Sequence, residues 1–189
     1  MNFQLLQFLA TAEHGDTSTL YLILGSFLEA GINVPKDDKK AFECYMKSAQ
    51  SGNPIGQALV GACYEEGTGI SKDEKEAFEW YLKSAEKGDS HGQFKLGTCY
   101  REGKGVPMDE KKAFEWFKRS SEGGSYYGKY NVGICYMKDG GNAEAQFIVG
   151  LSYRDGMGTP QNQEKAIEWM QKSKNNFEDD EFSKKWFAP

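Results

Sequence analysis

The 189-residue sequence has only two histidines, no long apolar run and no excess of basic residues. His14 and His91 stand without any C-x-x-C pair, so no metal site and no cofactor are expected. No apolar run approaches the ~20 residues that span a bilayer, which argues against membrane insertion. Lys and Arg total 23 against 28 Asp and Glu, giving a net charge of -5. Nucleic-acid binders normally carry a basic stripe, so nucleic acid is not an expected partner.

The amino-terminal sequence MNFQLLQFLATA only partly follows the pattern of a secretory signal. It has no positively charged start, and Gln4 and Gln7 interrupt its apolar residues. We therefore expect a cytoplasmic protein, with secretion or the endoplasmic-reticulum lumen as the alternative.

The four cysteines do not form a disulfide framework. Cys63, Cys99 and Cys135 stand 36 residues apart, and Cys44 occupies the position of Trp80 in the next copy. Stacked helix pairs lie about 10 Å apart, beyond the ~7 Å between Cα atoms that a disulfide tolerates. We expect these thiols to be small core residues in a reducing compartment.

What the sequence does contain is a repeat. The stretch from Gly88 to Gly124 recurs 36 residues earlier and, more loosely, 72 residues earlier. A glycine marks each copy, at positions 25, 61, 97 and 133, and a fifth, Gly150, follows after only 17 residues. A fixed period of this size predicts a stacked array in which each unit contacts its neighbours.

Each copy predicts two helices joined by a glycine turn. The first helix carries the repeat glycine, which we expect to allow close approach, with the tyrosine three residues later lying across it. Gly-x-Gly then supplies a left-handed helix end. The second helix begins after a capping residue, namely Asp37, Asp73, Asp109 or Asn162. Its glutamates at 43, 79, 115 and 168 are expected to be solvated.

These residues resemble the Sel-one-like repeat, a branch of the tetratricopeptide superfamily with the pattern A-x-x-x-L-G-x-x-Y-x-x-G-x-G-V-x-x-D-x-x-K-A-x-x-W-Y-x-x-A-A-x-x-G. The third copy matches at Gly92, Leu96, Gly97, Tyr100, Gly103, Gly105, Val106, Asp109, Lys112, Ala113, Trp116 and Gly123 or Gly124. The second matches at Gly56, Val60, Gly61, Tyr64, Gly67, Gly69, Ile70, Asp73, Ala77, Trp80, Tyr81 and Ala85. The resemblance implies an all-α, right-handed α/α superhelix (a solenoid) of helix-turn-helix repeats, and an adaptor or scaffold function.

We expect one repeat array over residues 1–189. Its parts are a partial repeat or cap helix (1–16), full repeats (17–52, 53–88 and 89–124), a truncated repeat (125–141), a full repeat (142–177) and a carboxy-terminal cap (178–189). The spacing of 17 in place of 36 removes 19 residues before Gly150. A real deletion and a gene-model error would look the same. We expect a distortion near 138–143, where a second helix is lost and residues 136–138 begin a merged helix.

The leading functional prediction is a non-enzymatic, monomeric scaffold that binds a partner protein or peptide in its concave groove. The resemblance and the helical phase place the groove positions three before, one after and four after the repeat glycine. The candidates are Phe94, Thr98, Arg101, Tyr130, Ile134, Met137, Phe147, Leu151 and Arg154. Aromatic and arginine side chains there suit a peptide with acidic groups, although the aromatic residues could equally fill space between neighbouring helices.

Two alternatives remain. One secreted, cysteine-rich branch of the family is linked with β-lactam binding or hydrolysis, but this chain lacks that branch's paired cysteines, and no nucleophile stands beside a base in any readable pattern. An enzyme is therefore not expected. The other alternative is a truncated repeat fragment without independent function, because an array that loses a helix exposes apolar surface.

Overall fold

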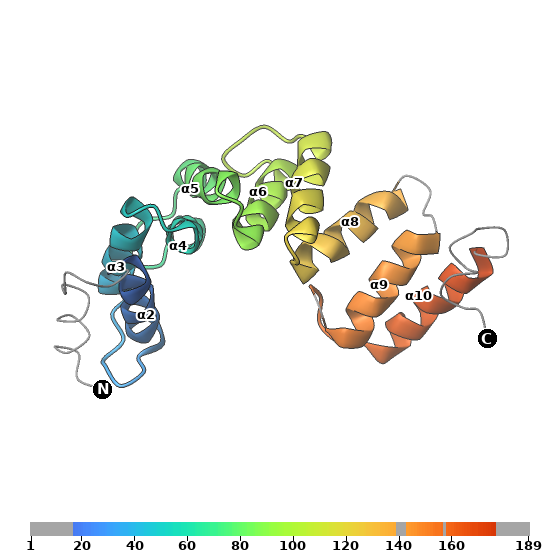
Figure 1. Ribbon diagram of the computed structural model, residues 1–189, viewed down its shortest axis with the longest axis horizontal. Helices are drawn as coiled ribbons and strands as arrows, with labels where there is room; N and C mark the ends of the chain where they lie inside the picture. Colours follow the sequence, from blue (N-terminus) through green and yellow to red (C-terminus); the bar gives the residue numbers. More distant parts are fainter. Residues whose placement is uncertain (1–16, 139–142, 157, 177–189) are drawn as a thin grey trace. The chain divides into compact units, whose positions relative to one another are not determined.

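The computed structural model describes residues 17–138, 143–156 and 158–176, and these residues form nine α-helices and no strand (Figure 1). The predicted all-α helical-repeat fold is confirmed. The chain divides into two compact units, Met1–Ala113 and Phe114–Pro189. The predicted end segments, 1–16 and 178–189, lie outside the described residues.

Unit 1 is built from paired helices. They are α2 (Thr17–Ala30), α3 (Asp38–Gln50), α4 (Pro54–Glu66), α5 (Glu74–Glu86) and α6 (Ser90–Glu102). We call α2, α4 and α6 first helices, and α3 and α5 second helices. Each second helix contacts the first helix before it and the one after it, and neighbouring first helices also touch. The boundary between the units falls within α7 (Glu110–Glu122).

The predicted helix ends are confirmed. The side-chain oxygens of the four capping residues accept backbone N–H groups three residues later, at 2.9–3.1 Å. Gly67 and Gly103, which end α4 and α6, have φ values of 79° and 71°. These local signals set the start of each second helix and the end of the first helices.

The repeat glycine packs against a different tyrosine from the one predicted. A Cβ on Gly61 would lie 2.7 Å from the ring of Tyr81, which belongs to the paired second helix. Tyr64 instead makes an edge-on contact with Phe42 of the preceding second helix, with ring centroids 5.5 Å apart. Tyr64 lies one turn beyond Gly61 and about 60° away around the helix axis, which directs it to the preceding second helix while the glycine faces the paired one.

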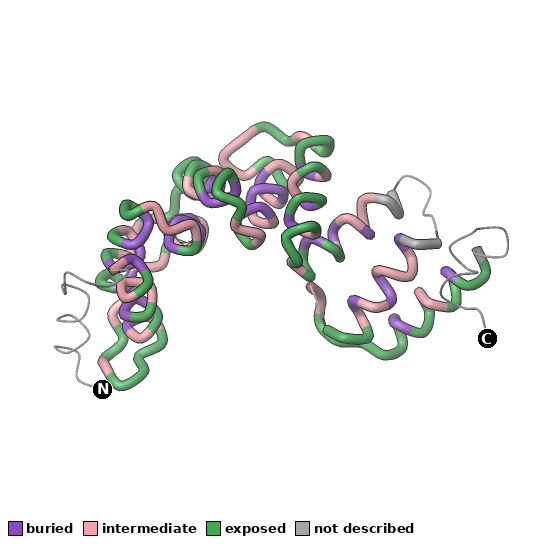
Figure 2. The backbone as a smooth tube through the Cα atoms, in the orientation of Figure 1, coloured by how far each residue is buried: buried purple, intermediate pink, exposed green. Residues whose placement is uncertain are grey.

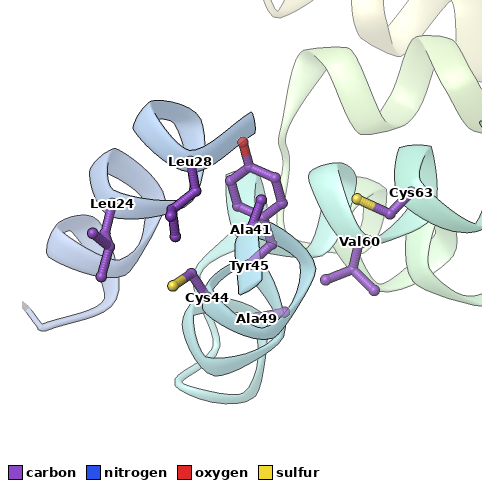
Figure 3. Close-up of a cluster of buried hydrophobic side chains, with 8 residues drawn as sticks. All are labelled: Leu24, Leu28, Ala41, Cys44, Tyr45, Ala49, Val60 and Cys63. Atoms are coloured by element: carbon purple, nitrogen blue, oxygen red, sulfur yellow. The ribbon is translucent and has the colours of Figure 1, made fainter. Parts of the chain in front are cut away.

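The core of unit 1 lies between the helix layers. Figure 3 shows Leu24 and Leu28 of α2 facing Ala41 and Tyr45 of α3, with Val60 of α4 on the other side. Buried residues recur on the inner sides of the helices, and the outer sides are exposed (Figure 2). Three predicted core thiols, Cys44, Cys63 and Cys99, are buried, and the four glutamates predicted to be solvated, at 43, 79, 115 and 168, are exposed.

Unit 2 contains the shortened repeat. Its helices are α8 (Tyr126–Lys138), α9 (Ala143–Asp155) and α10 (Gln163–Asn176), and α9 contacts both others. α8 begins as a first helix, because Gly128 lies against Ser120 and Ser121 of α7. The equivalent glycine of α6, Gly92, lies against Ser84 and Ala85 in the same way.

The place of the lost second helix is taken by helices that are already present. A Cβ on Gly133 of α8 would lie 3.4 Å from the carbonyl oxygen of Ala145 on α9, as one on Gly150 would lie 3.3 Å from that of Ala166 on α10. In turn, Gly158 of the α9–α10 loop packs on the amino-terminal end of α8 at Tyr126. In unit 1 the loop glycine Gly105 packs in this way on a second helix, α5. α8 therefore makes contacts of both kinds: those of a first helix toward α7 and toward Ala145 of α9, and that of a second helix beneath the α9–α10 loop. The predicted merged helix depends on residues 139–142, which lie outside the described residues.

Candidate partner-binding face

The predicted groove positions of unit 1 lie together on one side of α6. Phe94, Thr98 and Arg101 are half-buried. The buried residues of α6 are Gly92, Gln93, Leu96, Gly97 and Cys99. One side of α6 is thus packed in the core, and the other side is partly accessible to solvent. We call the accessible side of the first helices the first-helix face.

Local contacts hold the side chains of this face. The hydroxyl of Thr98 donates to the carbonyl oxygen of Phe94 at 3.1 Å. The ring of Phe94 lies 6.1 Å from that of His91, one turn earlier. Arg101 donates from Nη2 to Oε1 of Glu102 at 3.1 Å. The face therefore presents the ring of Phe94, the methyl group of Thr98 and the guanidinium of Arg101, which forms an ion pair with Glu102.

In unit 2 the candidates fall on α8 and α9. Ile134, Phe147 and Leu151 are half-buried, and the side chain of Met137 lies outside the described residues. Tyr130 packs within the unit: its ring meets that of Tyr153 edge-on at 6.2 Å. The role of α8 as a substitute second helix accounts for this use of Tyr130.

The second candidate arginine is exposed and paired with its neighbour. Arg154 donates from Nε and Nη2 to the two carboxylate oxygens of Asp155, at 2.6 and 2.8 Å. The Asp155 carboxylate raises the pKa of Arg154. Exposed pairs of this kind contribute little stability.

A partly buried ionic network joins the second and third repeats in unit 1, and the sequence prediction missed it. Glu65 of α4 accepts a hydrogen bond from the hydroxyl of Tyr81 at 2.7 Å. Its carboxylate also meets the Nζ atoms of Lys95 at 2.8 Å and Lys104 at 3.4 Å. Lys104 in turn contacts Glu102 at 2.9 Å. Only 17% of the Glu65 side chain is exposed, so its charge is largely withdrawn from water.

The network sets the ionisation of Glu65. Burial of the carboxyl group opposes its charge, but the hydrogen bonds from Lys95 and Tyr81 and the charge of Lys104 outweigh burial. The pKa of Glu65 is therefore lowered from the ordinary value of 4.5. A carboxylate with a lowered folded-state pKa stabilises the fold above its unfolded pKa, and this stability is lost as the pH falls through the folded value.

This linkage predicts an acid-sensitive contribution from Glu65. We expect the stability difference between the wild type and Glu65→Gln to be largest above about pH 4.5 and to shrink as the pH falls below that value. Urea denaturation from pH 3 to 7, followed by circular dichroism, measures it. Glu79→Gln, on the exposed side of α5, is the control and should show no such convergence. A difference that is independent of pH would contradict the prediction.

A signal for the network was present in the sequence. In the first two repeats a glutamate is followed 16 residues later by a tyrosine, as in Glu29 with Tyr45 and Glu65 with Tyr81. Both tyrosine hydroxyls donate to their glutamates at 2.7 Å. In the third repeat the same two positions hold Arg101 and Phe117, which cannot form this bond. Comparing the copies for such joint changes would have shown the pairing.

Two other features bear on function. Within residues 17–138, 143–156 and 158–176, no group of three or more His, Cys, Asp or Glu side chains could hold a metal ion. The helices of these same segments include none with the length and apolar character needed to cross a membrane.

A protein-family model and several solved structures match the chain. The Sel1 repeat model matches residues 21–53, 54–89, 90–125 and 143–176. No curated protein sequence matches. A Sel1 repeat protein from Oxalobacter formigenes is 27% identical with a TM-score of 0.67, over 92% of this chain and 77% of that one.

Two further structures are similar. The protective antigen c5321 of uropathogenic Escherichia coli, which displays an SLR fold, is 26% identical with a TM-score of 0.61. That match covers 84% of this chain and 38% of the antigen. Cysteine rich protein B of Helicobacter pylori is 23% identical with a TM-score of 0.50, over 66% of this chain and 92% of its own. This last likeness concerns the fold alone.

Proposed function

Because the chain belongs to the Sel1 repeat family, whose members generally act as protein-interaction scaffolds, we propose that it binds a partner protein along its first-helix face. It does so as an adaptor, without catalysing a reaction. The observation that supports this assignment is the division of α6 into a buried side and an accessible side that carries Phe94, Thr98 and Arg101. Aromatic and arginine side chains are enriched among residues that dominate binding energy.

The match covers several repeats, which supports a binding surface spread over more than one helix. Each repeat of unit 1 adds a first helix that contacts the previous first helix. Neighbouring first helices therefore lie side by side, and an extended partner segment can contact several repeats at once. The cytoplasmic location and the monomeric state predicted from the sequence stay predictions.

Affinity capture with a substitution in the middle of the face tests the proposal. Thr98→Arg places a large charged side chain between Phe94 and Arg101, and we expect recovery of the bound partner to fall at least tenfold. The control is Gln50→Arg, which makes the same charge change at an exposed position of a second helix. Both variants should retain the helical circular dichroism of the wild type. Equal recovery of every captured protein by the two variants would place binding elsewhere.

A further inference from the structure

We propose that the part of the first-helix face formed by α2 and α4 binds a lysine- or arginine-containing segment of the partner, with Glu29 and Glu66 receiving its cationic side chain. This inference rests on the proposed function and specifies the chemistry of the partner. It comes from comparing two copies of one arrangement, 36 residues apart in the same chain.

The copy in the second and third repeats contains its own cations. The carboxylates are Glu65 on α4 and Glu102 at the end of α6. Lys95 and Lys104 contact Glu65 at 2.8 and 3.4 Å, and Lys104 also contacts Glu102 at 2.9 Å. Lys95 projects from α6 toward the preceding first helix, so the ammonium groups lie between two neighbouring repeats.

The copy in the first and second repeats keeps the carboxylates and lacks the lysines. Glu29 and Glu66 occupy the positions of Glu65 and Glu102, and Tyr45 donates to Oε2 of Glu29 at 2.7 Å. Leu59 stands in place of Lys95, and Thr68 in place of Lys104. Among the described residues, no lysine or arginine nitrogen forms an ion pair with Glu29 or Glu66.

The charges that act on the buried thiols Cys63 and Cys99 differ between the two copies in the same way. Burial raises the pKa of Cys63 to about 12, and the surrounding charges that act on it are all negative, from Glu29, Glu66 and Asp38. Burial also raises the pKa of Cys99 to about 12, but there Lys104 and Lys95 oppose Glu65 and Glu102. The charges that act on Cys63 are thus acidic alone, whereas those that act on Cys99 include two lysines of the chain.

The surroundings indicate the class of cation. The next repeat shows that this backbone arrangement accommodates the ammonium groups of two lysine side chains. Leu59 is half-buried and packs against the core at the position where Lys95 lies in the next copy. An aliphatic stem can cover such apolar surface while its charged head reaches a carboxylate. A lysine or arginine side chain of a partner segment supplies both parts.

Direct binding of a basic probe tests the inference. We would titrate the full chain into fluorescein-labelled octalysine at 50 mM salt and follow the fluorescence anisotropy. The double variant Glu29→Gln, Glu66→Gln should weaken binding at least tenfold. The double variant Glu43→Gln, Glu79→Gln makes the same charge change on the exposed sides of second helices, and should change affinity less than twofold. Equal losses in the two variants, or no binding by the wild type, would overturn the inference.

A second pair of variants supplies the missing cation within the chain. Thr68→Lys places a lysine where the next copy has Lys104, and should weaken octalysine binding at least threefold by occupying the carboxylates. Ser71→Lys adds the same charge at an exposed position of the same loop, and should have less than half that effect. Equal effects of the two lysines would count against the carboxylate site.

These outcomes are separate from those that test the proposed function. Thr98→Arg could lose the captured partner while the double variant Glu29→Gln, Glu66→Gln binds octalysine as tightly as the wild type. In that case the face binds proteins through other chemistry, and only the inference fails. If Thr98→Arg and Gln50→Arg capture the same proteins, the proposed function fails, whatever octalysine does.

Discussion

Substituting Gly105 by alanine is expected to lower the free energy of unfolding by about 3–5 kcal/mol, near the upper end for single substitutions. Gly105 lies in the loop after α6 with φ of +70°, a conformation that alanine adopts at a cost. Its added Cβ would also collide with the carbonyl oxygen of Glu74 at the start of α5. Because the obstacle is backbone, the loop has to move away from the preceding second helix.

Gly88→Ala separates the two causes. Gly88 has φ of +86°, but nothing lies within 4 Å of an added Cβ. Only the backbone cost of about 1–2 kcal/mol then remains. Urea denaturation of both variants, followed by circular dichroism, measures the difference. Equal losses would show that the loop gives way at no cost and that its contact with α5 contributes little.

Replacing Glu65 by leucine is expected to cost about 3–5 kcal/mol, because it leaves two lysines and a buried tyrosine hydroxyl without their shared acceptor. Lys95 is only 23% exposed, so water compensates its charge poorly. Glu29→Leu is the matched substitution in the preceding repeat, where the tyrosine hydroxyl alone loses its partner. About 1–2 kcal/mol is expected there. Urea denaturation of the two variants at pH 7 provides the comparison.

A rescue experiment checks that the cost of Glu65→Leu comes from unpaired groups and not from the leucine. Adding Tyr81→Phe and Lys95→Leu removes two of the three donors to Glu65. A buried ionic group replaced entirely by apolar residues is often neutral in stability. We therefore expect the triple variant to recover at least half of the loss. A triple variant less stable than Glu65→Leu alone would show that Lys95 and Tyr81 stabilise unit 1 through other contacts.

The sequence predicts features that depend on neighbouring residues. A capping side chain lies three residues from the N–H group it accepts, so Asp37, Asp73, Asp109 and Asn162 could be identified from spacing alone. The burial of Cys63 and Cys99 and the exposure of the second-helix glutamates follow from helical periodicity in the same way, whereas Cys135, in the shortened repeat, is only half-buried. The chain's match to the family model confirms the repeat on which these predictions depended.

Features that depend on distant residues were predicted less well. Spacing shows that Gly61 needs a close neighbour, but not whether Tyr64 or Tyr81 provides it. Lys95 reaches a carboxylate 30 residues earlier in the chain, and a lysine on a helix surface gives no sign of such a partner. Phe94, Thr98 and Arg101 of α6 are half-buried and their role in binding stays a prediction, whereas Tyr130 packs against Tyr153 of α9 because α8 has a second role.

The second role of α8 bears on how many residues such a chain can lose at once. A helical array is usually regarded as a row of two-helix modules that are gained or lost whole. Because α8 makes contacts of both kinds, we expect recombination between coding sequences offset by half a module to yield a packed product. For protein engineers, α8 provides a natural junction at which arrays of unequal phase can be fused, with the glycines at 128, 133 and 158 as the contact points to preserve.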